Sequence, residues 1–341
     1  MRALIYYGPE NMKITDIPVP VPKENEVKLE IRYVGICGSD VHGYLGTTGR
    51  RIPPMIMGHE FSAVVTETGS KVTRFKVGDR VTALPILNCG TCPYCKAGLI
   101  NACENREFLG VMKRNGVLTE YVCLNEKHLY LLPDTLDDKT GALIEPFAVA
   151  YHALNKAEIK NKNVLIAGAG AIGLFALIVA KYLGAATVVV TDLSPERLEA
   201  AKRTGADIVI NPKVEDIGKI LEQHNLRTNI DVTVEAVGVS PTAQTTVNFV
   251  RNMGTIIWIG NSAQMIEINM QQIVTRELTI KGSYVYLPKD YEVSIKILSE
   301  GKINLNNFIS AVVGMNEAES MFKKLAAGDT TMVKVLVDVR L

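Results

Sequence analysis

The chain has 341 residues, 47% of them hydrophobic, and a formal net charge of +1. This length favours two domains over a single hydrophobic core. The near-neutral charge, without any block of like charges, argues against a protein that binds nucleic acid or a membrane surface through electrostatics. The first residues lack the apolar stretch and cleavage site of a signal peptide, and no apolar stretch is long enough to span a bilayer, so we expect a cytoplasmic protein.

Short strands joined by turns are predicted for the first hundred residues. Residues 26–36 alternate apolar and charged side chains, which is typical of a strand with one buried face. Glycine and proline interrupt the segment about every ten residues, as they do in all-β modules. We therefore expect a β-rich module at the start of the chain.

Four of the six cysteines lie in the short segment 89–103. They are separated by two, two and seven residues: Cys89, Cys92, Cys95 and Cys103. In a reducing compartment, thiols at such spacings are more often metal ligands than disulfide partners, the alternatives being a redox pair or incidental thiols. Four sulfur ligands complete the tetrahedral coordination of zinc and leave no position for a substrate. We predict a structural zinc in this lobe.

From about residue 150 onward, apolar runs typical of strands alternate with helical stretches. This alternation predicts a parallel, doubly wound sheet. The pattern becomes mixed after residue 286, and residues 333–340 are predicted to form a final strand that could rejoin the first module.

A glycine motif follows the first strand of this second region and opens an apolar helix. Gly168 permits a tight turn, Gly170 lets the backbone approach a pyrophosphate, and Gly173 allows close helix–strand packing. Asp192, nineteen residues further on, is placed to bind both ribose hydroxyls and to repel a 2′-phosphate; the alternative is a helix cap. The motif predicts NAD binding, although Arg197 could tolerate the phosphate of NADP and is interpreted as an adenosine-side contact.

Several motifs, in this order, resemble those of the zinc-containing medium-chain dehydrogenases, the group that holds alcohol, sorbitol and threonine dehydrogenases. They are GICGSDVH (35–42), GHE (58–60), VGDRV (77–81), the four-cysteine lobe, EPFAVAYHA (145–153), GAGAIG (168–173) and VVVTDLSPERL (188–198). The resemblance covers essentially the whole chain. It implies an α/β protein with a GroES-like β-rich catalytic domain at 1–150 and 286–341, a Rossmann NAD-binding domain at 151–285, and a homotetrameric assembly.

The resemblance also implies a second, catalytic zinc. Cys37 and His59 would bind it with a carboxylate as third protein ligand, and Glu145 fits the branch similar to sorbitol dehydrogenase. Glu60 adjoins the metal and would exchange with it or orient it. The fourth position stays open for water or the substrate alkoxide. The family therefore implies two zinc ions per chain and hydride transfer from an alcohol to NAD.

Further site residues follow from the same resemblance. Ser39 is placed to take the hydroxyl proton and His42 to pass it to solvent; the alternatives are a turn-stabilising hydroxyl and an exposed loop histidine. The backbone near 258–260 and 283–285 is expected at the nicotinamide. The cofactor-binding residues are then Gly168, Gly170, Ile172, Gly173, Asp192, Arg197, Ile259 and Ser283.

The expected substrate is a small alcohol. Glu145, in place of the thiolate of the animal alcohol dehydrogenases, points towards polyols such as sorbitol or galactitol, with or without a phosphate. Two positions depart from sorbitol dehydrogenase: Gly43 replaces a tyrosine, and Val285 replaces an arginine that contacts substrate. Threonine and 2,3-butanediol are alternatives, as is a catalytically silent zinc- and NAD-binding regulator. The intact set of Cys37, His59 and Glu145 argues against the regulator.

Overall fold

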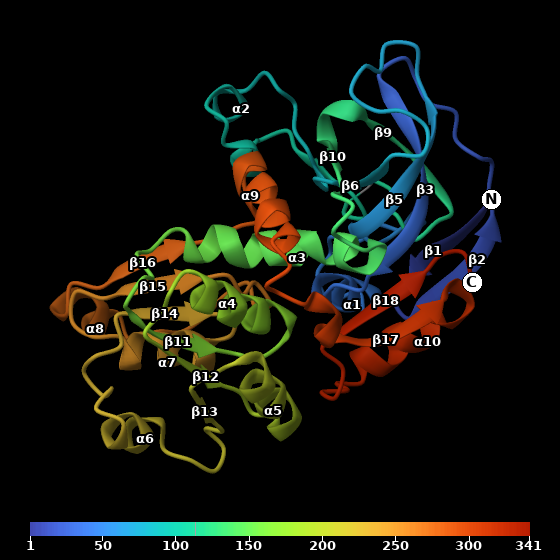
Figure 1. Cartoon of the computed structure of the whole chain (residues 1–341). Coiled ribbons are helices and arrows are strands. Elements are labelled where there is room, and N and C mark those ends of the chain that lie inside the picture. The colour runs from blue at the N-terminus through green and yellow to red at the C-terminus, as the bar shows by residue number, and fades with distance from the viewer. Residues whose placement is uncertain (113) are drawn as a thin grey trace. The chain divides into compact units, whose positions relative to one another are not determined.

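The computed structural model describes residues 1–112 and 114–341, which divide into two compact units (Figure 1). The first unit consists of Met1–Glu145 and Leu287–Leu341, and the second is Pro146–Tyr286. The break falls inside the long helix α3 (Asp138–Leu154), whereas the apolar pattern of the sequence changes near residue 150. The first unit is therefore built from two separate segments of the chain.

The first unit is dominated by antiparallel strands. Its strands are β1 (Arg2–Gly8), β2 (Asn11–Asp16), β3 (Glu26–Gly35), β4 (Met55–Ile56), β5 (Glu60–Thr68), β6 (Arg80–Ala83), β7 (Ile86–Leu87), β8 (Glu107–Phe108), β9 (Tyr121–Asn125), β10 (Leu129–Leu131), β17 (Ile309–Gly314) and β18 (Lys334–Asp338). Its helices, besides α3, are α1 (Gly38–Tyr44), α2 (Pro93–Lys96), α9 (Pro288–Ser299), α10 (Met315–Ala326) and the 3-10 turns η1 (Ile100–Ala102), η2 (Glu126–His128) and η3 (Leu305–Phe308).

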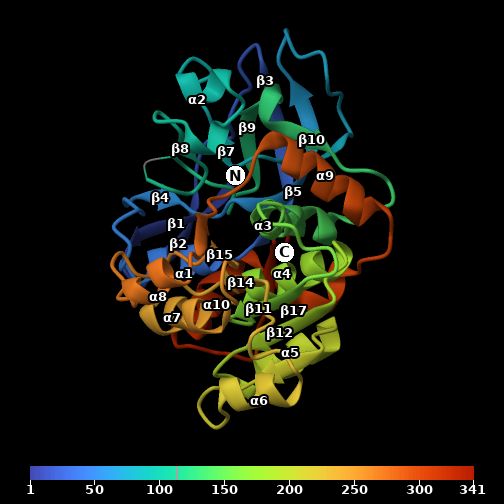
Figure 2. The ribbon, with the colours of Figure 1, turned by 90° about the vertical axis from the view of Figure 1, so that its left-hand side faces the viewer.

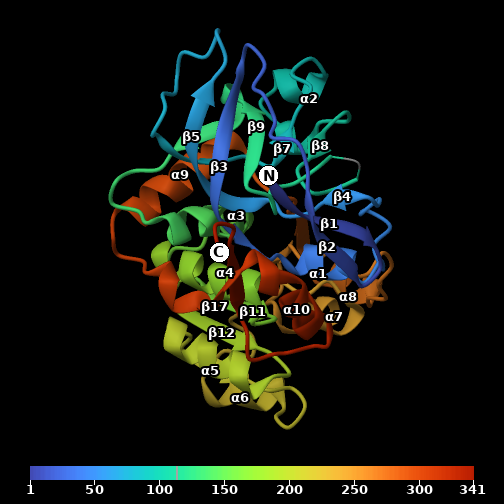
Figure 3. The ribbon, with the colours of Figure 1, turned by 90° about the vertical axis from the view of Figure 1, so that its right-hand side faces the viewer.

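Strand β3 organises the main sheet of this unit, whose order is β10-β6-β5-β3-β18-β17 with β9 also paired to β3 (Figure 3). Its alternating residues Val27, Leu29 and Ile31 are fully buried, which confirms the predicted one-sided strand. The late strand β18 runs antiparallel to β3 and parallel to β17, so it does rejoin the first module. A smaller sheet has the order β2-β1-β4, and the short pair β7–β8 lies near α2 (Figure 2).

The second unit contains a six-stranded parallel sheet of order β13-β12-β11-β14-β15-β16, which is the doubly wound arrangement that the sequence predicts. Its strands are β11 (Asn163–Ala167), β12 (Thr187–Thr191), β13 (Ile208–Ile210), β14 (Val232–Glu235), β15 (Thr255–Trp258) and β16 (Thr279–Gly282). Its helices are α4 (Ala171–Tyr182), α5 (Pro195–Thr204), α6 (Ile217–Gln223), α7 (Ser240–Phe249) and α8 (Met270–Thr275). Within the described part of the chain, no helix combines the length and the apolar character needed to cross a membrane.

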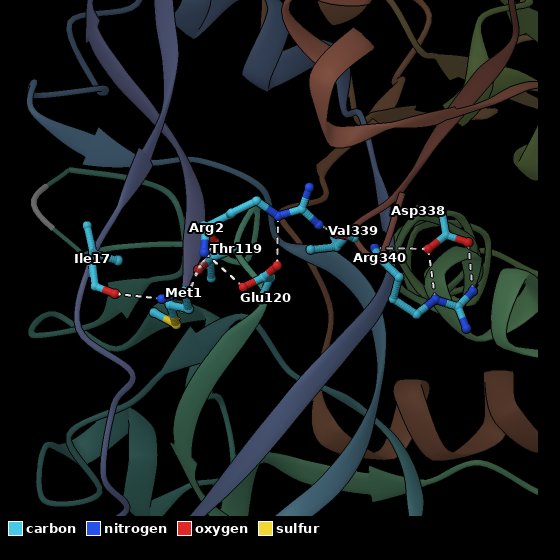
Figure 4. Close-up of polar contacts among 8 residues, drawn as sticks. All are labelled: Met1, Arg2, Ile17, Thr119, Glu120, Asp338, Val339 and Arg340. Carbon is cyan, nitrogen blue, oxygen red and sulfur yellow. Dashed lines mark hydrogen bonds and ion pairs between the residues drawn. The ribbon is translucent and has the colours of Figure 1, made fainter.

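Polar contacts tie the two segments of the first unit together (Figure 4). The Arg2 backbone amide and its Nε each donate to the Glu120 carboxylate at 2.8 Å, and Arg2 Nη2 donates to the Val339 carbonyl at 3.3 Å. The amino group of Met1 donates to the Ile17 carbonyl at 2.8 Å. Arg2 therefore links the first strand of the chain to residues that directly follow β18.

Candidate metal and cofactor sites

The four cysteines of the 89–103 segment come together at one point in the first unit. Their sulfur atoms all lie within 4.8 Å of one another. Cys92 caps the one-turn helix α2, and backbone amides point at the sulfurs: the Cys92 amide lies 3.4 Å from Cys89 Sγ and the Cys95 amide 3.4 Å from Cys92 Sγ. Four converging sulfurs supported by backbone donors fit a tetrahedral zinc site.

The surroundings of the four thiols favour the metal-binding thiolate form to different degrees. Hydrogen bonds from the Thr91 and Cys92 amides lower the pKa of the Cys89 thiol to about 5. The side-chain amide of Asn88 lowers the pKa of Cys95, whereas burial raises that of Cys103 to about 11. Because zinc binds thiolates, loading the lobe would displace the proton that burial retains on Cys103.

A second cluster unites three of the predicted metal ligands. Cys37 directly precedes helix α1, His59 directly precedes β5, and Glu60 is the first residue of β5. One donor atom from each lies within 4.8 Å of the others, and His59 and Glu60 are 4% and 1% exposed. A thiolate, an imidazole and a carboxylate form a donor set that suits zinc and that a fourth, non-protein ligand can complete.

Asp40 orients His59 within this cluster. Its Oδ2 lies 3.4 Å from His59 Nδ1, and its Oδ1 accepts a hydrogen bond from Arg51 Nη2 at 2.7 Å. Burial opposes the charge of Asp40, but His59 and Arg51 together hold the pKa of its carboxyl well below the usual value. Burial likewise opposes protonation of His59, and the Asp40 carboxylate raises its pKa. This ion-pair contact between a carboxylate and a histidine is of the kind that orients ligand imidazoles.

Glu60 forms a buried ion pair with Lys334, the first residue of β18, and both side chains are at most 2% exposed. Lys334 Nζ also donates to the Ile36 carbonyl at 3.2 Å. Glu145 is buried on α3, and its negative charge is one of several that raise the pKa of Lys334, so it lies in the same region. It is not among the side chains whose donor atoms converge in the described residues, so its role as a ligand stays a prediction.

The two residues of the predicted proton relay both lie on α1. The Ser39 hydroxyl is 3.4 Å from Cys37 Sγ and accepts a hydrogen bond from Arg51 Nη2 at 3.3 Å. His42 lies one turn further along the helix and is exposed. Ser39 is therefore next to a metal ligand, and His42 is in contact with solvent.

The glycine motif of the second unit has the geometry that a dinucleotide needs. Gly168 has a φ of +105°, which favours glycine, and a Cβ on Gly173 would collide with the Gly168 carbonyl. Nothing lies within 4 Å of the position that a Gly170 Cβ would take, so the N-terminus of α4 opens onto free space. Ile172 is half-buried in the first turn of α4. The residues present fit a bound pyrophosphate.

Asp192 follows β12 and faces this motif. Its Oδ2 accepts a hydrogen bond from the Ala169 amide at 2.7 Å and its Oδ1 one from the Ser194 amide at 2.9 Å. The Arg197 amide in turn donates to Ser194 Oγ at 3.2 Å, so Ser194 rather than Asp192 caps α5. This leaves the Asp192 carboxylate beside the glycine turn, where its predicted role requires it.

The remaining predicted cofactor residues lie at the ends of β15 and β16. The Ile259 amide donates to the Glu235 carbonyl at 2.9 Å, and the Ser283 amide donates to the Trp258 carbonyl at 2.8 Å. Val285 has a φ of +50°, an unusual conformation for a β-branched residue. The Ser283 hydroxyl is buried without a hydrogen-bond partner among the described residues.

Sequence reasoning missed three charged residues around the cluster of Cys37, His59 and Glu60. Asp40, Arg51 and Lys334 are each no more than 7% exposed. Asp40 had a local signal, since it lies within the GICGSDVH motif, and Lys334 is a charged residue inside an apolar strand. Arg51, in the RRIPP segment, had none.

Comparisons with known proteins agree over both units. The family profile "Alcohol dehydrogenase GroES-like domain" matches residues 23–134, and "Zinc-binding dehydrogenase" matches residues 171–300. A probable D-xylulose reductase A from Aspergillus clavatus is 36% identical over 335 residues, which are 96% of this chain and 94% of that protein.

Two solved structures from Escherichia coli give the same result. An oxidoreductase/dehydrogenase of unknown specificity has a TM-score of 0.93 at 34% identity, covering 99% of this chain and 98% of that one. Galactitol-1-phosphate dehydrogenase has a TM-score of 0.92 at 30% identity, covering 99% of this chain and 100% of that one. These similarities extend over essentially the full length of the chain.

Proposed function

The chain belongs to the zinc-binding dehydrogenases with an alcohol dehydrogenase GroES-like domain, and on this premise we propose that it oxidises a secondary hydroxyl of a polyol to a ketone, with NAD as hydride acceptor. The motif-based resemblance and the fold class, a GroES-like domain with a Rossmann domain, are thereby confirmed. The protein is an oxidoreductase. The relatives named for xylulose and galactitol phosphate support a polyol as the substrate class.

The observation that carries the proposal is the convergence of Cys37, His59 and Glu60 in a largely buried cluster. In the proposed site, Cys37 and His59 bind the metal together with a carboxylate from Glu60 or Glu145. Asp40 fixes the imidazole through its Nδ1. The zinc, when bound, supplies Lewis acidity that lowers the pKa of a coordinated hydroxyl.

Proton movement falls to the chain's own residues. Ser39, beside Cys37, accepts the proton of the substrate hydroxyl as it releases its own, and exposed His42 passes the released proton to solvent. NAD, when bound at the Gly170 opening, supplies the acceptor for the hydride that leaves the substrate carbon. The Asp192 carboxylate favours NAD, because it would repel the 2′-phosphate of NADP.

The first experiment is NADH formation by the purified protein with sorbitol, galactitol, galactitol phosphate, threonine and 2,3-butanediol. We expect the highest kcat/KM with a polyol or its phosphate. Threonine or butanediol in first place would contradict the polyol assignment while leaving the reaction class intact. The absence of turnover with every alcohol, in protein that contains zinc and binds NAD, would favour a silent regulator.

A matched pair of cysteine variants tests the site itself. Cys37→Ser should reduce kcat/KM by more than about 100-fold, because even the loss of an outer-shell contact to a metal ligand costs about 10–100-fold. Cys123→Ser, on β9 and outside both clusters, should retain wild-type activity. Equal activity of the two variants would rule out the assigned catalytic metal site.

A cytoplasmic location and a homotetramer complete the proposal. Close-spaced thiols that serve as metal ligands are typical of a reducing compartment. Light scattering tests the assembly: a particle of one chain mass would refute the tetramer.

A further inference from the structure

Arg51 is a buried cation that the mechanism above does not use. It lies in the loop between α1 and β4, and its side chain is 3% exposed. An arginine is seldom buried to this extent without a specific set of partners. Its position therefore calls for a functional explanation.

The guanidinium of Arg51 contacts both Asp40, which orients the metal ligand His59, and Ser39, which takes the substrate proton. Its Nη2 donates to Asp40 Oδ1 at 2.7 Å and also lies 3.3 Å from Ser39 Oγ. The other oxygen of Asp40 faces His59 Nδ1 at 3.4 Å. One nitrogen of Arg51 thus touches the residue that orients a metal ligand and the residue that takes the proton.

Helix α1 is shaped to admit this side chain. A Cβ on Gly43 would overlap Arg51 Cγ and would lie 3.2 Å from Nε and 3.3 Å from Cδ. Gly43 is the next-to-last residue of α1, so the cost of a glycine in the middle of a helix does not apply to it in full. The absence of a side chain at Gly43 leaves the space that the Arg51 stem occupies.

The contact with Ser39 constrains how that hydroxyl acts. A serine hydroxyl has one donor and two acceptor positions. Because Arg51 occupies one acceptor position, the hydroxyl hydrogen is directed elsewhere, and Cys37 Sγ lies 3.4 Å away. One acceptor position remains for the proton of a substrate hydroxyl. Arg51 Nε, buried and without a hydrogen-bond partner among the described residues, keeps further donor capacity inside the site.

We propose that Arg51 is a positioning residue. It holds Asp40 against His59 and sets the orientation of the Ser39 hydroxyl. The inference rests on the proposed function for its catalytic half. Its other half, the support of His59 as a metal ligand, holds whatever alcohol the enzyme oxidises. Gly43 is part of the same arrangement, because its lack of a side chain leaves space for the aliphatic part of Arg51.

The test compares Arg51→Met and Arg51→Lys with Arg50→Met, the exposed neighbouring arginine. In Arg51→Met, the affinity of the Cys37–His59 site for zinc should fall about 10–100-fold in a chelator competition, as measured for other outer-shell contacts. With saturating zinc, kcat should fall by a similar factor while KM changes little, because the proposed role of Arg51 acts through Asp40 and Ser39. Arg51→Lys should recover only part of both losses, because lysine lacks the planar fork. Arg50→Met should match the wild type.

A folded Arg51→Met variant with wild-type zinc affinity and wild-type kcat would overturn the proposal. If Arg51→Met does not fold, Gly43→Ala provides the second route: the added methyl displaces Arg51, so zinc affinity and kcat should fall in the same direction, and unchanged values would equally overturn it. The zinc measurement needs no substrate. A protein without dehydrogenase activity therefore refutes the proposed function and still tests the link from Arg51 to His59.

Discussion

At the scale of single residues, His128 is a buried histidine outside both metal clusters. It is 4% exposed, and burial, followed by the charges of Lys127 and Arg114, lowers its pKa to about 4. A histidine in an unfolded chain has a pKa of about 6.5. Between these two pH values the unfolded chain binds more protons than the folded one, so stability falls as the pH falls through this window.

His128→Asn tests this expectation. In the wild type, burial of neutral His128 costs almost no stability above about pH 6.5. At pH 5 it should lower the free energy of unfolding by about 2 kcal/mol. We expect the drop in the free energy of unfolding from pH 7.5 to pH 5, measured with urea at saturating zinc, to be smaller by this amount in the variant. His224→Asn, at an exposed position, serves as control. An equal drop in His128→Asn and the wild type would contradict the assignment.

At the scale of elements, the four-cysteine lobe is the part of the first unit that depends most on its metal. Helix α2 has only four residues, and none of its residues is buried. Such a short helix is not stable by itself and gains little from hydrophobic burial. Together with the buried side chain of Ile100, the converging sulfurs and the amides that point at them hold the segment in place.

Removing one sulfur should therefore release the lobe without unfolding the sheet. Cys95→Ser is expected to contain one zinc per chain instead of two, because a structural site needs all four ligands. Limited proteolysis should cut the variant within residues 89–103, while its far-ultraviolet circular dichroism stays close to that of the wild type. Cys123→Ser, the same substitution on β9, should keep both metals and resist cleavage. Uncut Cys95→Ser protein with two metals would exclude the structural site.

At the scale of the whole molecule, the first unit is closed by contacts between residues far apart in the chain. Arg2 binds Glu120 with two hydrogen bonds of 2.8 Å and reaches the Val339 carbonyl at 3.3 Å (Figure 4). The side chains of Arg2 and Glu120 are 33% and 26% exposed, so solvent weakens the charge interaction. The geometry stabilises the unit mainly through its multiple, well-placed hydrogen bonds.

Arg2→Met should lower the free energy of unfolding by about 1 kcal/mol, as expected for a half-buried charged hydrogen bond. A double-mutant cycle with Glu120→Gln isolates the pairwise interaction, measured by urea unfolding. We expect the two single losses to sum to more than the loss in the double variant. Strict additivity would show that the pair contributes nothing to the closure of the unit.

The predictable parts of the molecule are those encoded by local patterns. The alternation in β3 and the spacing of Gly168 and Gly173 each follow from a few consecutive residues, and the structure bears out the strand and the tight glycine turn. The converging cysteines were also predictable, because their spacing alone restricts where the sulfurs can lie.

The parts that sequence reasoning missed depend on long-range contacts. Lys334 acquires its role only by contacting Glu60 and the Ile36 carbonyl, and the second of these contacts joins residues 298 positions apart. Arg51 owes its burial to the absence of a side chain at Gly43, which no local pattern reveals.

The position of β18 in the main sheet has a consequence for the synthesis of the protein. The strand inserts between β3 and β17, and it carries Lys334, the counter-ion of Glu60. Domains usually fold in the order in which they are translated. Here residues 146–286 are complete while β3 still lacks one of its partners and the metal site lacks its buried cation. A nascent or truncated chain that stops before residue 334 thus has a complete second unit and an incomplete first unit. In that first unit, the edge of β3 that pairs with β18 stays exposed.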